Sequence, residues 1–278
     1  MRGPTDSSPP TPALVLDGGA RAIPRAAVLG IDLAVTDYEQ TMDWLDEVVR
    51  SGGRACVTAA AVHLVMVAQE DPETKAAIDG ALVVPDGVPL VWALHALGHR
   101  RATRVYGPDL MANYCARSAR TGTRSFLYGG RSDEALARLT TALQERFPGL
   151  VIAGGWSPPF RELTEAERDE VAARINGSGA DVVWVGTGQP KQEKWMAQMR
   201  DRLDAPILAG VGAAFDFHAG IVPQAPPWMQ RHGLEWTYRL AREPRRLWRR
   251  YARYNPRFVV AFARQYAAER AGRESERG

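Results

Sequence analysis

Residues 181–216 read DVVWVGTGQPKQEKWMAQMRDRLDAPILAGVGAAFD. The segment contains two short apolar runs, 181–185 and 207–211, and each run leads into a glycine-containing loop. Between them, residues 192–203 have their apolar side chains at the spacing of an amphipathic helix. A strand, a helix and a second strand joined by short loops form the unit from which parallel sheets are built. The segment therefore predicts an α/β fold.

The same alternation of apolar runs and helical patterns extends over most of the chain. Strands are predicted at 55–61, 81–85, 125–128, 150–153, 181–185 and 207–211, and helices at 38–50, 89–97, 109–120, 133–147, 165–176 and 192–203. Ser132 and Thr164 stand where they can cap two of these helices. Because strands and helices alternate, we expect a Rossmann-like, doubly wound and mostly parallel sheet that is covered on both faces.

The two ends of the chain differ in composition from this central part. Residues 1–24 are rich in Pro, Gly and Ser and show no hydrophobic period, which predicts a disordered tail. Residues 231–278 carry 13 arginines, 5 glutamates and no lysine, a charge of +8, whereas the whole chain carries only +3. We therefore expect a tail over 1–24, an α/β core over 25–230 and a basic helical appendage over 231–278.

The arginines of the appendage follow a regular spacing. Arg239, Arg242, Arg246, Arg249 and Arg253 recur at three- and four-residue steps, with Leu, Trp, Tyr and Phe side chains interleaved. On one continuous helix they would form a basic stripe beside an aromatic stripe. This pattern suits an anionic membrane surface or a lid that clamps phosphates, but a solvated helix packed through its aromatic side explains it equally well.

The overall composition indicates a globular protein of the cytoplasm. Hydrophobic residues make up 45% of the chain and charged residues 24%, as in ordinary globular proteins. The sequence has neither an uninterrupted apolar run of about 18 residues that would span a bilayer nor the layout of a secretory signal. Cys56 and Cys115 lack the spacing of metal ligands or disulfides, so we expect them to be buried thiols in a reducing compartment.

Glycine-containing loops follow several of the predicted strands. They are 128–130 (YGG), 186–193 (GTGQPKQE) and 210–216 (GVGAAFD). In a doubly wound sheet the carboxyl ends of the strands meet at one edge, where ligands bind, and glycines there let backbone N–H groups approach phosphates. The loops predict an anionic, nucleotide-bearing ligand, unless the glycines serve only tight turns. The last loop lacks the third glycine of a dinucleotide fingerprint, which argues against a nicotinamide cofactor.

Asp86 stands between Pro85 and Gly87 directly after a predicted strand. A carboxylate on such a turn is suited to act as a general base toward a hydroxyl group, although an Asp at this position also suits a cap for the helix that begins near Pro89. The chain contains no Asp-x-Asp pair of the kind that holds a divalent metal beside a nucleotide. We therefore expect no metal and no other cofactor, with arginines neutralising the leaving phosphates instead.

From residue 28 to residue 258 the chain resembles the WecG/TagA/CpsF glycosyltransferases, glycosyltransferase family 26. The resemblance rests on segments in a fixed order, namely 84–87 (VPDG), 104–110 (RVYGPDL), 186–195 (GTGQPKQEKW), 210–220 (GVGAAFDFHAG), 233–236 (GLEW) and 243–247 (EPRRL). It implies an inverting, metal-independent transfer of a sugar from a UDP-sugar donor to a polyprenyl-diphosphate-linked saccharide acceptor. The reaction would serve cell-surface polysaccharide synthesis at the inner face of the cell membrane.

The resemblance also assigns roles to residues of this chain. Asp86 would be the base, Thr58, Arg104 and Gln192 would line the reaction centre, and Asp216 would contact the nucleoside. Arg239, Arg246 and Arg249 would close over the pyrophosphate. The residues that we expect to bind substrate or nucleotide also include Gly129, Gly186, Gln189 and Lys191, from the glycine loops.

One departure from the family pattern concerns the donor sugar. Many relatives carry Asn where this chain has Ala60, so an N-acetylmannosamine-type sugar, glucuronic acid and other hexoses all stay open as donors. A non-catalytic sugar-nucleotide sensor and a nucleic-acid-binding protein with a basic tail are the rival functions. The glycine loops that converge with Asp86 argue against nucleic acid as a partner. A homo-oligomer also stays open.

Overall fold

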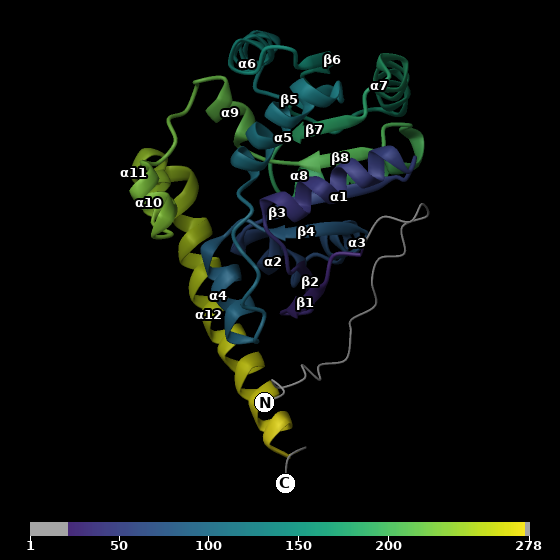
Figure 1. Ribbon diagram of the computed structural model, residues 1–278. Coiled ribbons are helices and arrows are strands. Elements are labelled where there is room, and N and C mark those ends of the chain that lie inside the picture. Colours follow the sequence, from purple (N-terminus) through teal and green to yellow (C-terminus); the bar gives the residue numbers. More distant parts are fainter. Residues whose placement is uncertain (1–21, 276–278) are drawn as a thin grey trace.

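The computed structural model describes residues 22–275, apart from the side chains of Pro227, Arg231, Arg246 and Arg273 (Figure 1). Its centre is a sheet with the strand order β1-β2-β4-β3-β8-β7-β5-β6. All neighbouring strands are parallel except β1 and β2, which form an antiparallel hairpin. The strands are β1 Arg25–Val28, β2 Ile31–Ala34, β3 Ala55–Ala60, β4 Ala81–Pro85, β5 Arg124–Gly129, β6 Val151–Trp156, β7 Val182–Gly186 and β8 Ile207–Gly210.

Helices cover both faces of the sheet, as a doubly wound fold requires. One face packs against side chains of α1, α5, α6 and α9, and the other against side chains of α2, α3, α4, α7 and α8. The helices are α1 Tyr38–Arg50, α2 Val62–Ala68, α3 Pro72–Asp79, α4 Val88–Ala96, α5 Gly107–Thr121, α6 Asp133–Arg146, α7 Glu165–Ser178, α8 Lys191–Met199, α9 Ala214–His218, α10 Pro227–Arg231, α11 Glu235–Arg242 and α12 Pro244–Ser275. The predicted Rossmann-like α/β fold is confirmed.

Local capping agrees with the sequence prediction at two helices. Ser132 accepts a hydrogen bond from the backbone N–H of Ala135 at the start of α6. Thr164 forms a full capping box with Glu167 at the start of α7. These bonds satisfy backbone donors that have no partner within the helix, so they fix where the two helices begin.

The hairpin of β1 and β2 and the short helices α2 and α3 are absent from the sequence prediction. The hairpin turn uses Leu29 at φ 52° and Gly30 at φ 70°, a conformation in which leucine is rare. The turn is held from outside, because Gln265 of α12 accepts a hydrogen bond from Leu29 N at 2.8 Å and Gln69 donates to Leu29 O at 2.7 Å. Contacts distant in sequence therefore stabilise this turn.

The C-terminal segment is not one continuous helix, which corrects the predicted arginine stripe. Glu243 separates α11 from α12, because a residue before proline is disfavoured in the helical conformation and Pro244 begins a new helix. Arg239 and Arg242 therefore lie on α11, whereas Arg249 and Arg253 lie on α12. Helix α12 runs along one side of the molecule (Figure 1) and contacts α2.

The structure describes the predicted core, 25–230, and most of the predicted appendage, 231–278. Residues 1–21 of the predicted tail lie outside the described residues. In the appendage, α12 buries Leu247 and Phe258, and Phe258 belongs to the same core cluster as α2 and α4. Within residues 22–275, none of the helices is both long and apolar enough to cross a membrane.

Candidate active site

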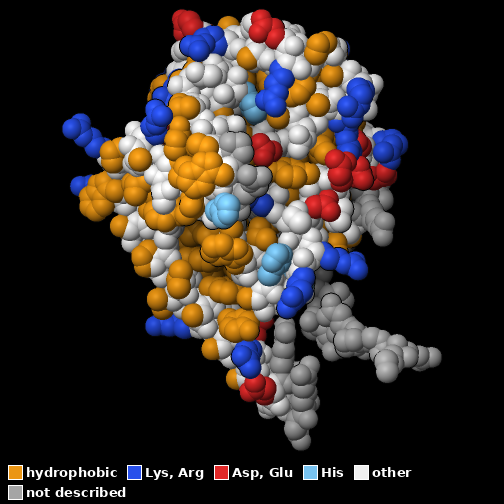
Figure 2. All heavy atoms as spheres, turned by 60° about the vertical axis from the view of Figure 1, so that its left-hand side comes forward, with side chains coloured by type: hydrophobic (Ala, Val, Ile, Leu, Met, Phe, Trp, Pro, Cys, Tyr) orange, Lys and Arg blue, Asp and Glu red, His pale blue; other side chains and the backbone are white. Residues whose placement is uncertain are grey.

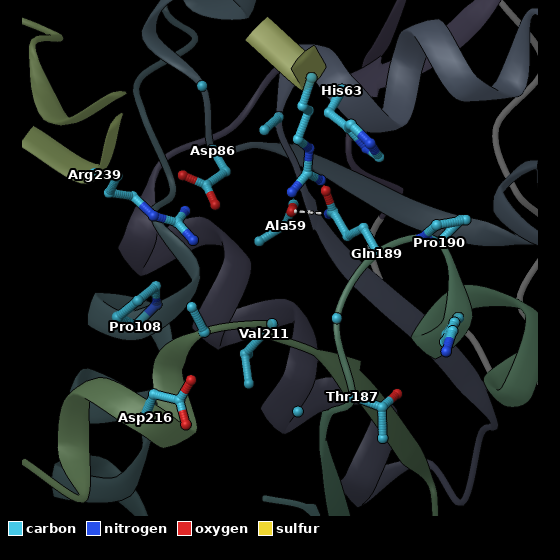
Figure 3. Close-up of a pocket in the computed structure, with 18 of the residues that line it drawn as sticks. Ala59, His63, Asp86, Pro108, Thr187, Gln189, Pro190, Val211, Asp216 and Arg239 are labelled. Atoms are coloured by element: carbon cyan, nitrogen blue, oxygen red, sulfur yellow. Dashed lines mark hydrogen bonds between the residues drawn. The ribbon is translucent and has the colours of Figure 1, made fainter. Parts of the chain in front are cut away.

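A pocket of about 1170 Å³ lies at the carboxyl ends of the central strands. The ends of β3 and β4 contribute Ala59 and Asp86, and the loops after β7 and β8 contribute residues 186–190 and 211–213 (Figure 3). Helices α11 and α12 complete the wall with Arg239, Arg250 and Tyr254, among others. The strand-end loops thus meet at the edge of the sheet where ligands bind in doubly wound folds.

Close packing explains why glycine stands at positions 129 and 186, at the ends of β5 and β7. A side chain on Gly186 would lie 2.5 Å from the ring of Phe215, and one on Gly129 would lie 2.9 Å from the backbone of Gly186. Gly129 therefore supports the loop that carries Gly186, while Gly186 itself and the neighbouring Gly130 line the pocket. Both predicted glycines come to this edge of the sheet, and both have a packing role there.

Asp86 projects into the pocket from the turn after β4 (Figure 3). Its backbone N–H donates to Ala60 O at 2.9 Å, which fixes the turn to the end of β3. The alternative role as a helix cap does not apply, because Gly87 caps α4 and no side chain bonds there. Burial raises the pKa of Asp86, and this outweighs the opposing effect of Arg104 and Arg239. A carboxylate with a raised pKa is a stronger proton acceptor once it is ionised.

Arg104 lies beside Asp86 and is held by several contacts. Its Nε donates to Asp86 O at 2.6 Å, and its guanidinium lies 4.2 Å from the ring centre of Tyr106. Its Nη2 lies 3.4 Å from Asp86 Oδ1 and also donates to Glu235 Oε2 of α11. The sequence predicts a role for Arg104 but not for Glu235, which lies in the family motif 233–236 (GLEW). Burial raises the pKa of Glu235 as well, and the negative charge of Asp86 adds to this effect.

Thr58 and Gln192 are fully buried and lie beneath the pocket wall. Both donate to Glu193 Oε1, Thr58 from its hydroxyl at 2.6 Å and Gln192 from its amide at 2.8 Å. The amide oxygen of Gln192 accepts from Gly212 N at 3.0 Å. This network joins the end of β3, the first turn of α8 and the loop after β8. The structure therefore brings the two residues together, as supports of the pocket.

Glu193 is the residue of this network that sequence reasoning missed. Its side chain is 1% exposed, and burial raises its pKa despite the hydrogen bonds that it accepts. A carboxyl group in this state is neutral up to a higher pH than an exposed one. In the sequence, only its position directly after Gln192 in the glycine-loop motif indicates that Glu193 supports the pocket.

The nucleotide-binding candidates lie on the loop after β7 and at the starts of α8 and α9. Asp216, on α9, forms two hydrogen bonds with Arg131, at 2.9 and 2.7 Å, and both residues line the pocket. Gln189 donates to Ala59 O at 2.7 Å, the dashed contact in Figure 3, and Lys191 lines the wall beyond it. The structure thus gathers these predicted residues around one cavity, with Arg131 as an addition.

The predicted arginine clamp is brought together only in part. Arg239 lines the pocket and points toward Asp86 (Figure 3). Arg249 is instead exposed and lies over the ring of Trp248 at 5.6 Å, outside the pocket lining, whereas its neighbour Arg250 lines the pocket. The side chain of Arg246 lies outside the described residues. Arg249 and Arg250 both lie on α12, where adjacent side chains point about 100° apart, so Arg250 faces the pocket and Arg249 does not.

The pocket also contains a histidine, His63, whose ring packs edge-on against Tyr254 at 5.1 Å. Burial and the charge of Arg250 lower its pKa to about 3, so the ring is neutral at physiological pH. In the described part of the chain, no group of three or more His, Cys, Asp or Glu side chains is arranged to hold a metal ion.

The fold and the position of the pocket define a doubly wound α/β protein with a ligand site at the carboxyl edge of its sheet. Residues 26–272 match the family of glycosyl transferases described as WecG/TagA/CpsF. The chain therefore belongs to the WecG/TagA/CpsF glycosyltransferase family. Membership of this family implies a glycosyltransferase of cell-surface polysaccharide synthesis.

Proposed function

We propose that the protein is an inverting, metal-independent glycosyltransferase. It moves a sugar from a UDP-sugar to a saccharide carried on a polyprenyl diphosphate. The acceptor oxygen forms a bond to the anomeric carbon while the bond from that carbon to the diphosphate oxygen breaks, and UDP leaves with the electron pair. Asp86 takes the proton of the acceptor hydroxyl group. The single observation that carries the proposal is the partly buried Asp86 carboxyl in a large pocket between Arg104 and Arg239.

The charges around the pocket suit the two ends of a nucleotide diphosphate. Arg239 faces Asp86 and would stabilise the charge that develops on the leaving diphosphate. Asp216, at the far side of the pocket, offers carboxylate oxygens to the hydroxyl groups of a nucleoside, with Arg131 fixing its orientation. Arg239 thus supplies positive charge for the diphosphate, and Asp216 supplies a hydrogen-bond acceptor for the nucleoside attached to it.

The residue at the end of β3 bears on the identity of the donor sugar. Ala60 is fully buried and its carbonyl oxygen accepts from the N–H groups of Asp86 and Gly87. The chain therefore lacks the amide that many relatives place here, while the backbone still holds the base. We propose a donor that does not need this amide, with N-acetylmannosamine-type sugars, glucuronic acid and other hexoses as the candidates.

We also propose that the protein works at the inner face of the cell membrane, which it contacts through its C-terminal helices. Hydrophobic side chains gather over α4 and α10–α12 on the face shown in Figure 2. Trp92, Trp228, Trp236 and Trp248 are between 43% and 62% exposed, an unusual exposure for so many large apolar rings. Tryptophan favours the interface between lipid and water. Trp236 also lines the pocket, so a lipid-linked acceptor could enter beside this face.

A donor screen tests the proposal. Purified protein is incubated with UDP-glucuronic acid, UDP-N-acetylmannosamine or other UDP-hexoses, with and without a polyprenyl-diphosphate monosaccharide, and UDP release is measured. We expect release that depends on the acceptor and a product of inverted anomeric configuration. UDP binding without acceptor-dependent release from any donor would instead support the sugar-nucleotide sensor.

A further inference from the structure

Glu235 stands in the first turn of α11, and its side chain is directed at the same guanidinium as Asp86. Arg104 Nη2 donates to Glu235 Oε2 and lies 3.4 Å from Asp86 Oδ1. The exposed fractions of the three side chains are 15% for Glu235, 18% for Arg104 and 20% for Asp86. Two partly buried carboxylates that line the pocket therefore share one cation.

Other contacts fix the rest of the Arg104 side chain, so Nη2 is the atom that Asp86 and Glu235 share. Nε is bonded to the backbone oxygen of Asp86 at 2.6 Å, and the guanidinium rests on the Tyr106 ring at 4.2 Å. A guanidinium can pair with a carboxylate through two parallel bonds. Here Arg104 gives the Asp86 side chain one long contact instead, because Nε is engaged by the backbone oxygen of Asp86 and Nη2 by Glu235.

We propose that Glu235 is a positioning residue for the reaction, which draws Arg104 away from a full ion pair with Asp86 and fastens α11 over the pocket. This inference rests on the proposed role of Asp86 as the base. It gives α11 a function in the chemical step, since the base would have its working environment only when α11 is docked. Glu235 itself does not need to touch the substrate.

The consequence for Asp86 follows from the charges that face it. Arg104 comes from the segment before α5, and Arg239 and Glu235 come from α11. Tyr38 of α1 and Tyr106 are neutral neighbours, because burial raises the pKa of each, and Asp109 of α5 faces Tyr38 and Glu235. Glu235 weakens the pairing of Asp86 and adds a like charge nearby. Both effects raise the pKa of Asp86, so removing Glu235 should lower it.

A purely mechanical role for Glu235 makes a different prediction. If the residue only fastened α11 to the core, its loss would weaken substrate binding and leave the pKa of Asp86 unchanged. The two roles therefore separate in a titration of Asp86 that does not depend on activity.

The experiment uses the full chain labelled with ¹³C at the aspartate carboxyl groups. The Asp86 signal is assigned by its loss in Asp86→Asn and is titrated by NMR in the wild type and in Glu235→Gln. We expect the pKa of Asp86 to fall by about one unit in Glu235→Gln. Glu243→Gln is the matched control, because it removes the same charge just after the C-terminal end of α11, and it should leave the pKa of Asp86 within a few tenths of its wild-type value.

A second background tests whether the effect passes through Arg104. In Arg104→Lys the shared Nη2 is gone, so the additional Glu235→Gln change should move the pKa of Asp86 much less. An unchanged Asp86 titration in Glu235→Gln, or an equal shift in both backgrounds, overturns the inference. If the Asp86 pKa falls while the acid limb of the kcat/KM profile stays in place, the positioning stands and the assignment of Asp86 as the base fails.

Discussion

Glu193 accepts a hydrogen bond of 2.6 Å from the hydroxyl of Thr58, a residue 135 positions earlier in the chain. The bond joins α8 to the end of β3 below the pocket floor. Through Gln192, the same network reaches the backbone of Gly212 in the loop after β8. A buried carboxyl group thus ties together segments that together carry the pocket.

The first prediction concerns the size of this contribution. Glu193→Ala leaves the Thr58 hydroxyl and the Gln192 amide without their shared acceptor, so the free energy of unfolding should fall by about 1–3 kcal/mol. Glu193→Gln keeps an oxygen acceptor of similar shape, so its free energy of unfolding should fall by less than about 1 kcal/mol. Urea denaturation followed by circular dichroism measures both. Equal loss in the two variants would show that the hydrogen bonds are not the cause.

The pH dependence of stability is a second prediction from the same residue. Burial raises the pKa of Glu193 in the folded protein above its unfolded value. Its contribution is therefore fully present below the unfolded pKa of about 4.3 and is lost as pH rises through the folded pKa. The wild type should lose stability relative to Glu193→Gln as pH increases over that range. A difference between the two proteins that stays constant as pH rises above the unfolded pKa would contradict the raised pKa.

A third prediction tests the packing of the loop after β7. Gly186→Ala places a methyl group 2.5 Å from the Phe215 ring, so the ring or the loop must shift. Overpacking of this kind costs about 1–3 kcal/mol, and UDP affinity should fall as the loop moves. Gly177→Ala in α7 is the control, because its methyl group meets no atom within 4 Å. It should stabilise the protein by up to about 1 kcal/mol. Thermal denaturation and UDP titration calorimetry measure both variants.

A fourth prediction concerns the nucleotide end of the pocket. Asp216→Asn removes the charged acceptor that Arg131 orients, so UDP should bind about tenfold more weakly, the loss of one charge-assisted hydrogen bond. The control is Asp169→Asn, which breaks an ion pair with Arg202 that lies outside the pocket lining. Calorimetric titration with UDP compares the two variants. Equal affinities for the wild type and Asp216→Asn would remove Asp216 from the nucleotide site.

Much of the fold could be predicted from the sequence, for a physical reason. Strands β3, β4, β7 and β8 are buried on both faces, so they appear as apolar runs whose ends are marked by glycine, proline or aspartate. The hairpin of β1 and β2 was missed because its strands have four residues each and its turn is stabilised by Gln265 and Gln69 from elsewhere. No local pattern carries that information.

In the candidate site, too, the residues fixed by local sequence were predicted and those fixed by tertiary contacts were missed. Asp86 was predicted because a strand end fixes where a carboxylate must lie. Glu193 was missed as a site residue because its burial arises only from tertiary packing. Glu235 was missed because it shares Arg104 with Asp86 through contacts between distant segments, which residue spacing does not encode. Arg249 was predicted for the pocket from the resemblance to the family, whereas the structure places the neighbouring Arg250 there. Adjacent residues of a helix point about 100° apart, so the two side chains cannot share one face of α12.

The central claim is that Asp86 is the base of a glycosyl transfer, and its most direct test is the turnover of Asp86→Asn with UDP affinity measured on the same preparation. The amide keeps the shape of the side chain but cannot accept the proton, so kcat should fall by about two to four powers of ten while UDP still binds. Asp201→Asn, an exposed site away from the pocket, is the control. Wild-type turnover in Asp86→Asn with intact UDP binding would contradict the claim.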